Sequence, residues 1–442
     1  MKILKSLIAC IVILSQVTIA PADVIQQKEG TKNCTFVLDT RQARYGYGDA
    51  FFSKGSPAVT VARTNDATHW GTYQNSAGTL VRDSSNTIRL AYGTYDINGY
   101  TPYPNPIILR EGAVQNMVWW NEDLTNAQWV KTDTTIGSNE AAAPDAATTA
   151  DSVTATAANG TCIQATAGVD ASSASVFLKR KTGTGKVYVT WDNGETYTDI
   201  TAALAAGLVV GEWIRPYSEG YVAATSRGIG IKIETSGDAV YMWGAQMESG
   251  KKITSSYIPT NGTRYTRNKD SLTYAGASNF TVSDSGSILL RFRILRKPNQ
   301  QVAGNDYRTL LMMQIDASNY WTIKFNSQAN NYCYFTTKNA TSETATSFGN
   351  FDAFNKYDSI TLIVLYSAAG SYPGQSTWKE NTFVNGMFVN HGNATYPPVG
   401  AVPNIVMDDS SNDMGLEVLI FSPEVWTLDE VAEMQAKYGG SL

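Results

Sequence analysis

The sequence is poor in the side chains that most catalytic sites use. Its 442 residues include only two histidines, His69 and His391, and neither lies in a recognisable catalytic motif. A Ser-His-Asp or Cys-His system needs a histidine beside its nucleophile. The patterns G-x-S-x-G and H-E-x-x-H and a phosphate-binding Walker loop are also missing. We therefore expect that the protein is not an enzyme.

Cysteines are few and far apart. They are Cys10, Cys34, Cys162 and Cys333, and none has the C-x-x-C spacing that is typical of zinc or redox sites. We expect buried free thiols after residue 22. One disulfide between domains is the alternative.

Acidic residues offer one candidate cation site but no glycosidase pair. Glycoside hydrolysis needs two carboxylates on either side of the scissile bond, and Glu417 stands alone in its predicted strand. The segment with Asp408, Asp409 and Asp413 could hold calcium, because it offers closely spaced oxygen ligands. A solvated turn is the alternative, and we expect no cofactor.

Charged residues make up only 17% of the chain, with 34 basic and 39 acidic residues and a net charge of −5. This balance gives no overall attraction to nucleic acid or to an anionic membrane, so we expect no nucleic-acid partner. What the chain has instead is 24 tyrosines, 10 tryptophans and 36 glycines. Aromatic residues and turn formers in such numbers predict an all-β protein.

Residues 1–22 differ from the rest of the sequence. Lys2 and Lys5 precede an apolar run at 7–14, and Ala20 and Ala22 follow it. This order is typical of a secretory signal peptide, and the run is shorter than the ~20 residues of a membrane helix. We expect a signal-peptide-like segment, or an anchoring segment that the mature protein keeps.

Two segments in the middle of the sequence form a matched pair. The first reads N-M-V-W-W-N-E-D-L-T-N-A-Q-W at 116–129, followed by A-P-D-A-A-T-T-A-D at 143–151. The second reads V-Y-M-W-G-A-Q-M-E-S-G at 240–250, followed by T-S-S-Y-I-P-T at 254–260. They resemble a carbohydrate-binding-module-like domain of bacteriophage tail, fibre and head-spike proteins, whose motifs read roughly N-L-L-x-x-S-E-D-F-S-N-A-x-W, A-P-D-G-T-x-T-A-D, Y-x-W-G-A-Q-L-E-x-G and S-Y-I-P-T. The resemblance implies that the segments form the first and last strands of one β-sandwich.

This resemblance also assigns the motif tryptophans. Trp129 and Trp243 occupy motif positions, so we expect them in the sandwich core, together with Trp120. On this interpretation the paired motif fixes the fold and does not mark a binding site. Any contacts with a ligand would then lie in the loops between the two segments or in the C-terminal domain.

The C-terminal part shows a different pattern. Its predicted strands at 287–294, 320–325 and 359–366 and a hairpin with Asn-Gly at its tip, 382–389, resemble the concanavalin A-like or laminin-G-like lectin fold. The last strand, 416–421, precedes a predicted helix whose start is marked by a capping box of Thr427 and Glu430.

We therefore predict two successive jelly-roll β-sandwiches after a small N-terminal β region, with a short C-terminal helix. The predicted parts are a signal-peptide-like or anchoring segment at 1–22, an N-terminal β-hairpin and attachment region at 23–115, a carbohydrate-binding-module-like sandwich at 116–265, and a concanavalin A/laminin-G-like sandwich at 266–442. Segments at 62–68, 78–80 and 108–111 resemble the stretch that precedes the module in the phage proteins.

Sugar recognition uses flat aromatic faces together with polar side chains. In the module, the candidates Tyr188, Trp191 and Tyr197 lie in or beside the predicted turn at 192–194. The C-terminal candidates are Trp321, Tyr332, Tyr334, Tyr372 and Trp378. For each of them, packing in the core or an ordinary surface position is the alternative.

The resemblance implies a virion-associated fibre, spike or tail-type protein, with a host cell-surface glycan or other virion subunits as partners. It further implies a homo-oligomer, a trimer, located on the virion or outside the cell. One alternative is a secreted bacterial glycan-binding protein or glycan-active enzyme that uses the module for targeting. A structural decoration subunit without a ligand is another.

Overall fold

A computed structural model describes the parts of the chain that form regular structure. The described residues are 27–29, 32–34, 36–40, 44–45, 59–62, 71–83, 88–166, 172–206, 212–218, 227–249, 254–274, 285–295, 307–326, 332–340, 342–350, 354, 358–367, 380–385, 387–392, 404–408, 414–422 and 424–438. The predicted signal-peptide-like or anchoring segment, 1–22, lies outside these ranges. Among the described residues, no helix is long and apolar enough to cross a membrane.

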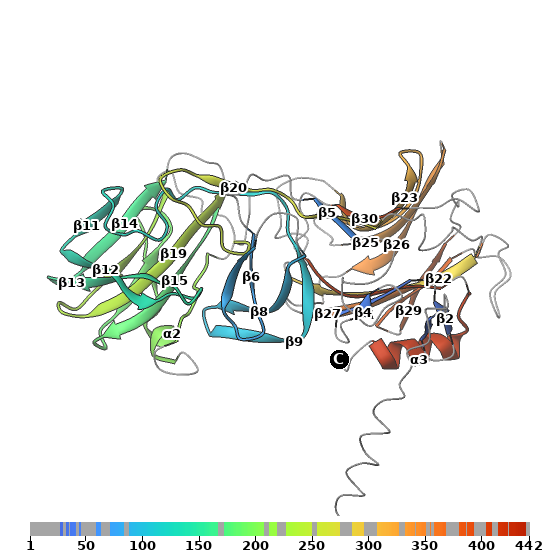
Figure 1. Cartoon of the computed structure of the whole chain (residues 1–442), viewed down its shortest axis with the longest axis horizontal. Helices are drawn as coiled ribbons and strands as arrows, with labels where there is room; N and C mark the ends of the chain where they lie inside the picture. The colour runs from blue at the N-terminus through green and yellow to red at the C-terminus, as the bar shows by residue number, and fades with distance from the viewer. Residues whose placement is uncertain are drawn as a thin grey trace, which may run out of the picture.

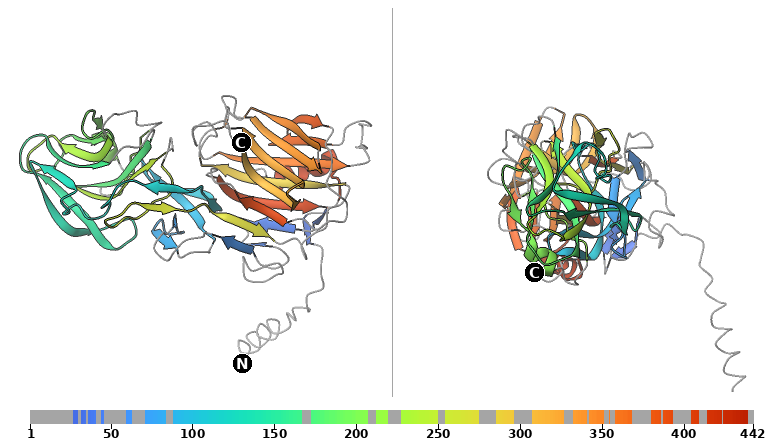
Figure 2. Two further views of the ribbon diagram at one scale, coloured as in Figure 1. Left: turned by 90° about the horizontal axis from the view of Figure 1, so that it is seen from above. Right: turned by 90° about the vertical axis from the view of Figure 1, so that its left-hand side faces the viewer.

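Nearly all regular structure is antiparallel β-sheet, as the composition predicts, and two β-sandwiches lie at opposite ends of an elongated molecule (Figures 1 and 2). A hairpin of β8 and β9 lies between them. The strands up to this hairpin are β1 (Gln27–Glu29), β2 (Lys32–Cys34), β3 (Phe36–Asp39), β4 (Arg44–Tyr45), β5 (Val59–Ala62), β6 (Gly71–Gln74), β7 (Leu80–Asp83), β8 (Leu90–Asp96) and β9 (Gly99–Arg110).

The first sandwich, which we call the module, spans residues 114–267. One sheet has the order β12-β13-β19-β10-β20 with β15 also paired to β19, and the other has the order β11-β14-β18-β16-β17. Its elements are β10 (Val114–Asn116), β11 (Trp129–Thr132), β12 (Thr134–Ala142), β13 (Thr148–Ala155), β14 (Gly160–Thr166), β15 (Ser172–Thr182), β16 (Val187–Thr190), β17 (Thr198–Asp199), α2 (Thr201–Ala206), β18 (Arg227–Ile233), β19 (Ala239–Ser249) and β20 (Tyr265–Arg267).

The core of the module follows from the alternation of its strands. In β16, Val187 and Val189 point into the core while Tyr188 between them is half-buried. The same core contains Ile229 and Ile231 of β18. The two paired segments do form strands of one sandwich, because β10 pairs with both β19 and β20.

The second sandwich is larger. One sheet has the order β26-β25-β24-β23-β30-β21-β5, and the other has the order β29-β28-β27-β22-β31-β3-β4, with β9 also paired to β31. Its C-terminal elements are β21 (Ser271–Tyr274), β22 (Ser285–Ile294), β23 (Tyr307–Asp316), β24 (Asn319–Asn326), β25 (Tyr332–Asn339), β26 (Ser342–Asn350), β27 (Ser359–Ser367), β28 (Glu380–Val384), β29 (Met387–Gly392), β30 (Asn404–Asp408), β31 (Met414–Ser422) and α3 (Leu428–Tyr438).

The C-terminal helix explains why the central strands of this sandwich are apolar on both faces. Helix α3 places Val431, Met434 and Tyr438 against the outer face of the sheet, where they meet Leu289 and Ile363. The predicted capping box is present: the Thr427 N–H donates to Glu430 Oε2 at 2.6 Å, and the Glu430 N–H donates to Thr427 Oγ1 at 3.3 Å.

The sheets of the larger sandwich cross the domain boundaries that the sequence predicts. Strand β5 pairs with β21, and β3 pairs with β31. Leu38 of β3 and Ile108 of β9 are both 0% exposed and belong to the core of this sandwich. Residues of the predicted N-terminal region 23–115 thus supply strands to the C-terminal sandwich, and the module is inserted between two parts of that sandwich.

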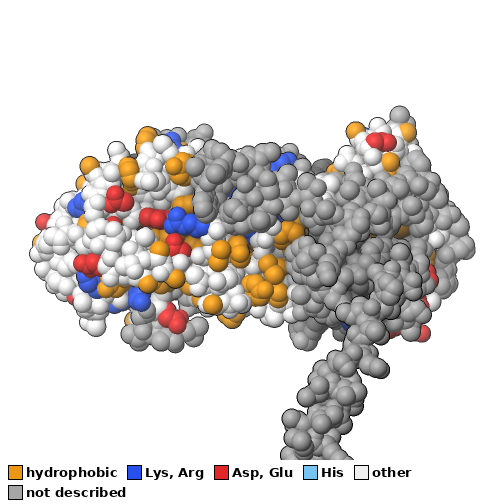
Figure 3. Space-filling view, viewed as in Figure 1, with side chains coloured by type: hydrophobic (Ala, Val, Ile, Leu, Met, Phe, Trp, Pro, Cys, Tyr) orange, Lys and Arg blue, Asp and Glu red, His pale blue; other side chains and the backbone are white. Residues whose placement is uncertain are grey.

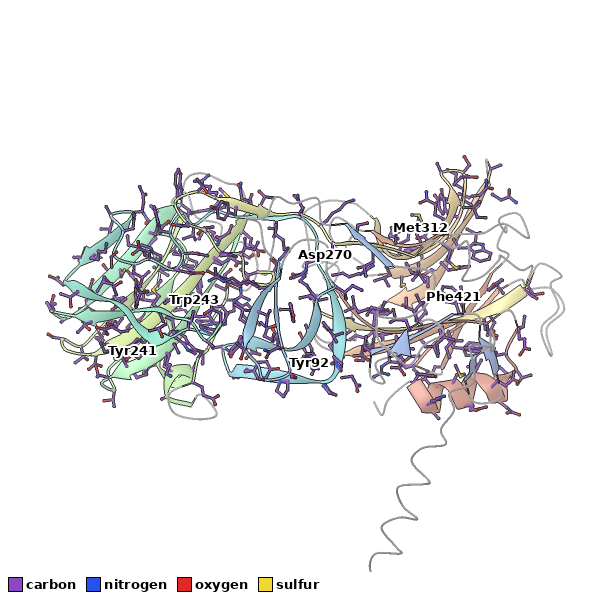
Figure 4. All side chains as sticks on the ribbon, viewed as in Figure 1. Tyr92, Tyr241, Trp243, Asp270, Met312 and Phe421 are labelled. Carbon is purple, nitrogen blue, oxygen red and sulfur yellow. The ribbon has the colours of Figure 1, made fainter. Side chains whose placement is uncertain are left out.

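A buried ion network lies where the module leaves the rest of the chain. Arg89 Nη1 is 2.7 Å from Glu111 Oε2, which also contacts Arg267 Nη1 at 3.0 Å, and Arg89 further binds Asp270. Burial alone would lower the pKa of Arg89, but the carboxylates of Asp270 and Glu111 outweigh burial and raise it. Figure 4 labels Asp270 between the two sandwiches.

Buried groups elsewhere have structural roles. Cys162 and Cys333 are free and buried, as expected, and burial raises the pKa of the Cys162 thiol to about 12. The Glu417 carboxylate is 0% exposed and lies 2.5 Å from Arg291 Nε and 2.7 Å from Arg293 Nη2. A carboxylate held in this way is not in a position to act on a substrate.

Candidate functional site

The polar residues of the paired motif join its two segments through backbone hydrogen bonds. Asn116 Nδ2 donates to the carbonyl of Ile258 at 2.9 Å, and its Oδ1 accepts from the Met247 N–H at 3.1 Å. Gln246 Oε1 accepts from the Ile258 N–H at 2.7 Å. Asn121 Nδ2 also donates to Ile258. The amide side chains of the motif therefore satisfy backbone groups that no strand partner reaches.

The motif tryptophans lie where the sequence places them. Trp129 is 1% exposed and Trp243 is 0% exposed, and Trp243 is labelled inside the module in Figure 4. The Trp243 ring packs against Tyr257 with ring centroids 4.5 Å apart. Trp120 differs from the expectation, since it is only half-buried and packs on the edge of the core.

Trp120 forms part of a pocket of about 530 Å³ in the module. Most of the lining residues belong to the paired motif. Strand β12 adds two more, β7 and β20 add one each, and Asn261 follows the last motif segment. The lining residues are Arg82, Trp120, Glu122, Asp123, Thr125, Ser138, Asn139, Thr149, Asp151, Pro259, Thr260, Asn261 and Tyr265. Two aromatic rings and several oxygen-bearing side chains thus surround one cavity.

Local backbone geometry fixes the Trp120 wall. Trp120 pairs with Asn261 in an isolated β-bridge, and the Gly262 N–H donates to the Trp119 carbonyl at 2.8 Å. Gly262 has a φ of 78°, and a side chain there would meet the Trp120 ring at 2.9 Å. Glycine at this position lets the turn approach the indole closely.

Asp123 and Asp151 line the pocket and bind backbone N–H groups of the surrounding loops. Asp123 Oδ1 accepts from the Thr125 N–H at 2.9 Å. The two oxygens of Asp151 accept from the N–H groups of Leu124 at 2.7 Å and Asn139 at 2.8 Å. Burial raises the pKa of Asp151, although these two N–H groups act in the opposite direction.

Arg82 closes one side of the pocket. Its Nη2 lies 2.6 Å from Glu122 Oε1 and 3.1 Å from Asp145 Oδ2. Tyr257 also donates to Glu122 Oε1. Burial, with a further contribution from Glu122, raises the pKa of Tyr257 well above its ordinary value, so its hydroxyl remains a donor at neutral pH.

One polar group at the pocket lacks a partner. Thr260 is 5% exposed, and its Oγ1 has no hydrogen-bond partner among the described residues. A buried hydroxyl without a partner costs free energy.

The structure brings together two of the three candidate residues of the module. Tyr188 of β16 and Tyr197 are half-buried, with ring centroids 6.5 Å apart. Lys232 of β18 lies over both rings, with Nζ at 4.4 Å and 4.2 Å from their centroids. This contact occupies part of the aromatic surface that a sugar would use.

Other candidates lie apart from this cluster. Trp191 is partly buried against the module core. Trp321 is 2% exposed within the core of the larger sandwich and packs on Tyr366 with centroids 5.0 Å apart. A ring so enclosed has no free face for a sugar, so burial contradicts the expectation that Trp321 contacts a ligand.

Most of the remaining candidate residues are not described by the structure. Tyr372, Trp378, Asp409 and Asp413 lie outside the described residues. Asp408 ends β30, where its backbone pairs with Ser271. Within the described ranges, no group of three or more potential ligands is placed to hold a metal ion.

Sequence reasoning located the paired segments but missed the pocket that they form. The signal was present in the acidic residues Glu122, Asp123 and Asp151, since carboxylates are rare in cores. The interpretation from the sequence assigns the motif to the fold alone.

Comparisons with known proteins add little to this geometry. No family model matches the sequence, and no curated protein matches it, so the phage resemblance stays a prediction. Among solved structures, the chain is similar to the binding domain of botulinum neurotoxin DC in complex with SialylT, with 13% identity, a TM-score of 0.30 and coverage of 38% of this chain and 39% of that chain. It is also similar to the Ruminococcus gnavus IT-sialidase CBM40 bound to alpha2,6 sialyllactose, with 10% identity, a TM-score of 0.26 and coverage of 34% and 82%.

The chain thus spans about two fifths of the length of the neurotoxin structure. At these identities and TM-scores, neither likeness carries an argument about what the chain binds.

Proposed function

We propose that the chain is a virion-associated fibre, spike or tail-type protein that binds a cell-surface glycan through the pocket of the module. The observation that carries the glycan part is the pocket itself, with Trp120 and Tyr265 beside carboxylate and hydroxyl groups. Sugar rings present apolar C–H faces to aromatic rings, and their hydroxyls bond to such oxygens. The virion part rests on the resemblance of the paired segments, which also implies a homotrimer.

Two features support the pocket over the Tyr188–Tyr197 cluster. The pocket is concave, whereas Lys232 already covers both rings of the cluster. Hydrogen bonds of the motif already hold the side chains of its walls in place. Little side-chain conformational freedom is therefore lost when a ligand binds.

A single site of this kind would bind weakly, and several copies on one particle would raise the overall avidity. The proposed role is attachment without catalysis, on the virion or in the extracellular space. Other virion subunits are the second class of partner.

The test is a glycan array with the full chain and two tryptophan variants. Trp120→Ala removes the pocket wall and should lower the signal about tenfold or more. Trp119→Ala is the matched control, because Trp119 is the neighbouring residue, is 39% exposed and does not line the pocket. Equal losses in both variants, or no signal with the wild-type chain, would refute the pocket as a glycan site.

A secreted glycan-binding protein or glycan-active enzyme is the second candidate. The same array would detect its binding, so reducing-sugar release from capsule or lipopolysaccharide distinguishes the enzyme. Mass spectrometry of the mature N-terminus distinguishes export from retention of residues 1–22.

A further inference from the structure

The pocket has a strongly unequal balance of charges. Three carboxylates line it, those of Glu122, Asp123 and Asp151, against the single guanidinium of Arg82. That guanidinium is already bound by Glu122 and by Asp145 behind it. A ligand entering the pocket therefore meets an excess of negative charge.

Oxygens of two of these carboxylates remain free to accept hydrogen bonds. Asp123 uses Oδ1 to bind Thr125, and Glu122 uses Oε1 to bind Arg82 and Tyr257. Within the described residues, Asp123 Oδ2 and Glu122 Oε2 make no hydrogen bond of their own. Ionised carboxylates only accept hydrogen bonds, so these oxygens favour hydroxyl and ammonium groups.

The excess of negative charge is a property of the pocket lining. On the face of the module in view, acidic and basic side chains are sparse and interspersed (Figure 3). The net charge of the whole chain is only −5. Selection by charge must therefore come from the pocket residues and act at short range.

We propose that the pocket selects sugars by charge: it takes a ring bearing an ammonium group in preference to a neutral ring, and it rejects carboxylated, sulfated or phosphorylated rings. An acidic substituent would have to enter beside Asp123 and Asp151, and the one cation of the lining, Arg82, already pairs with Glu122 and Asp145. Such like-charge placement gives specificity by repulsion. The ammonium group of an amino sugar can donate to Asp123 Oδ2 or Glu122 Oε2. This inference rests on the proposed glycan-binding function of the same pocket.

The experiment begins with the glycan array described above and uses the full chain. One glycan that binds is then made in three forms that differ at a single position, with an N-acetyl, a free amino or an N-sulfo group. Titration calorimetry at neutral pH compares the three. We expect the amino form to bind about tenfold more tightly than the N-acetyl form, and the N-sulfo form at least about tenfold more weakly. Raising the salt concentration should reduce both of these differences in affinity.

Asp123→Asn is the diagnostic variant. Asparagine keeps the Oδ1 acceptor for Thr125 and removes one negative charge, so the loop should keep its shape. The ratio between the dissociation constants of the N-sulfo and amino forms should fall about tenfold. Glu195→Gln is the matched control, because it removes the same charge from an exposed residue of the module that does not line the pocket.

The outcomes separate the two proposals. If glycans bind and Trp120→Ala abolishes binding, but acidic forms bind best, the charge selection is wrong and the glycan function stands. An equal effect of Asp123→Asn and Glu195→Gln would also overturn the selection. If no glycan binds, or Trp120→Ala leaves binding unchanged, both proposals fail.

Discussion

The module and the larger sandwich are both antiparallel β-sandwiches, yet the chain builds them in opposite ways. The module uses one continuous stretch, residues 114–267, and its first and last strands are direct neighbours, with Val114 opposite Arg267. The larger sandwich combines β3, β5 and β9 with strands beyond residue 270. Continuity lets the module build its two sheets from one stretch of chain, although Leu80 packs in its core and Arg82 binds Glu122. The larger sandwich needs strands from both ends of the chain.

The two regions also differ in what holds their ends together. In the module, side-chain amides such as Asn116 and Gln246 bind the backbone of the opposite segment. In the larger sandwich, apolar residues such as Leu38 and Ile108 fill the core. Polar residues with fixed partners leave a recognisable motif in a sequence, and interchangeable apolar residues do not.

Cutting the chain at the module boundary should give the largest effect. We expect a fragment of residues 71–270, which keeps the contacts of Leu80 and Arg82 with the module, to fold by itself. A fragment of residues 269–442 should remain unfolded, because it lacks β3, β5 and β9. Circular dichroism and urea titration of both fragments measure this. Cooperative unfolding of the 269–442 fragment would show that the larger sandwich folds without the N-terminal strands. The contrast between a continuous module and a discontinuous sandwich would then be wrong.

The buried ion network should matter next. Arg89→Met leaves the Glu111 and Asp270 carboxylates with one cation fewer, and we expect a loss of about 3–5 kcal/mol in the free energy of unfolding. Arg82→Met is the control, because its side chain is 32% exposed in its ion pairs and should cost at most about 1 kcal/mol. Urea unfolding followed by tryptophan fluorescence measures the free energy of unfolding of both variants. Equal losses would contradict a special role for the buried ion network.

A pair of conservative ring changes should give smaller effects. Trp321→Phe removes volume from the core of the larger sandwich and should cost about 1–3 kcal/mol. Tyr188→Phe removes only a hydroxyl from a half-buried ring and should stay within about 0.5 kcal/mol. Thermal unfolding of both variants tests the assignment of Trp321 to the core, which a negligible cost for Trp321→Phe would refute.

The smallest effect should be a pH dependence confined to the module. Burial of Asp192 opposes its ionisation, but hydrogen bonds from Thr196 and Thr190 outweigh burial and lower its pKa. A lowered folded-state pKa contributes stability above the unfolded pKa, and this contribution is lost as the pH falls through the folded value. Asp192→Asn should therefore lessen the loss of module stability on acidification, as measured by thermal unfolding between neutral and acid pH, and leave the larger sandwich unchanged.

The sequence predicted local features well and long-range pairing poorly. The predicted strand at 359–366 and the box of Thr427 and Glu430 depend on neighbouring residues, and they appear as β27 and the start of α3. The pairing of β5 with β21 depends on residues far apart in the sequence, which short apolar runs cannot specify. The domain boundary at residue 115 therefore missed the strands that cross it.

The candidate site was predicted in part. Trp129 and Trp243 were correctly assigned to the core because their motif positions implied it. Exposure of a lone aromatic residue could not be derived in the same way, since Trp321 and Tyr188 both lie in alternating strands and differ only in which face is covered. The pocket needed the fold, because Trp120, Asp151 and Tyr265 meet only when β13, β19, β10 and β20 line up in one sheet.

The adjacency of the strands at the two ends of the module has a mechanical consequence. A force applied between the N-terminal and C-terminal strands of the chain is carried within the larger sandwich. It does not pass through the module. A pull on a ligand held by the module travels instead through the paired strands β10 and β20 and into the ion network around Glu111. Tension on a tethered particle would therefore load this junction first, while the pocket keeps its shape.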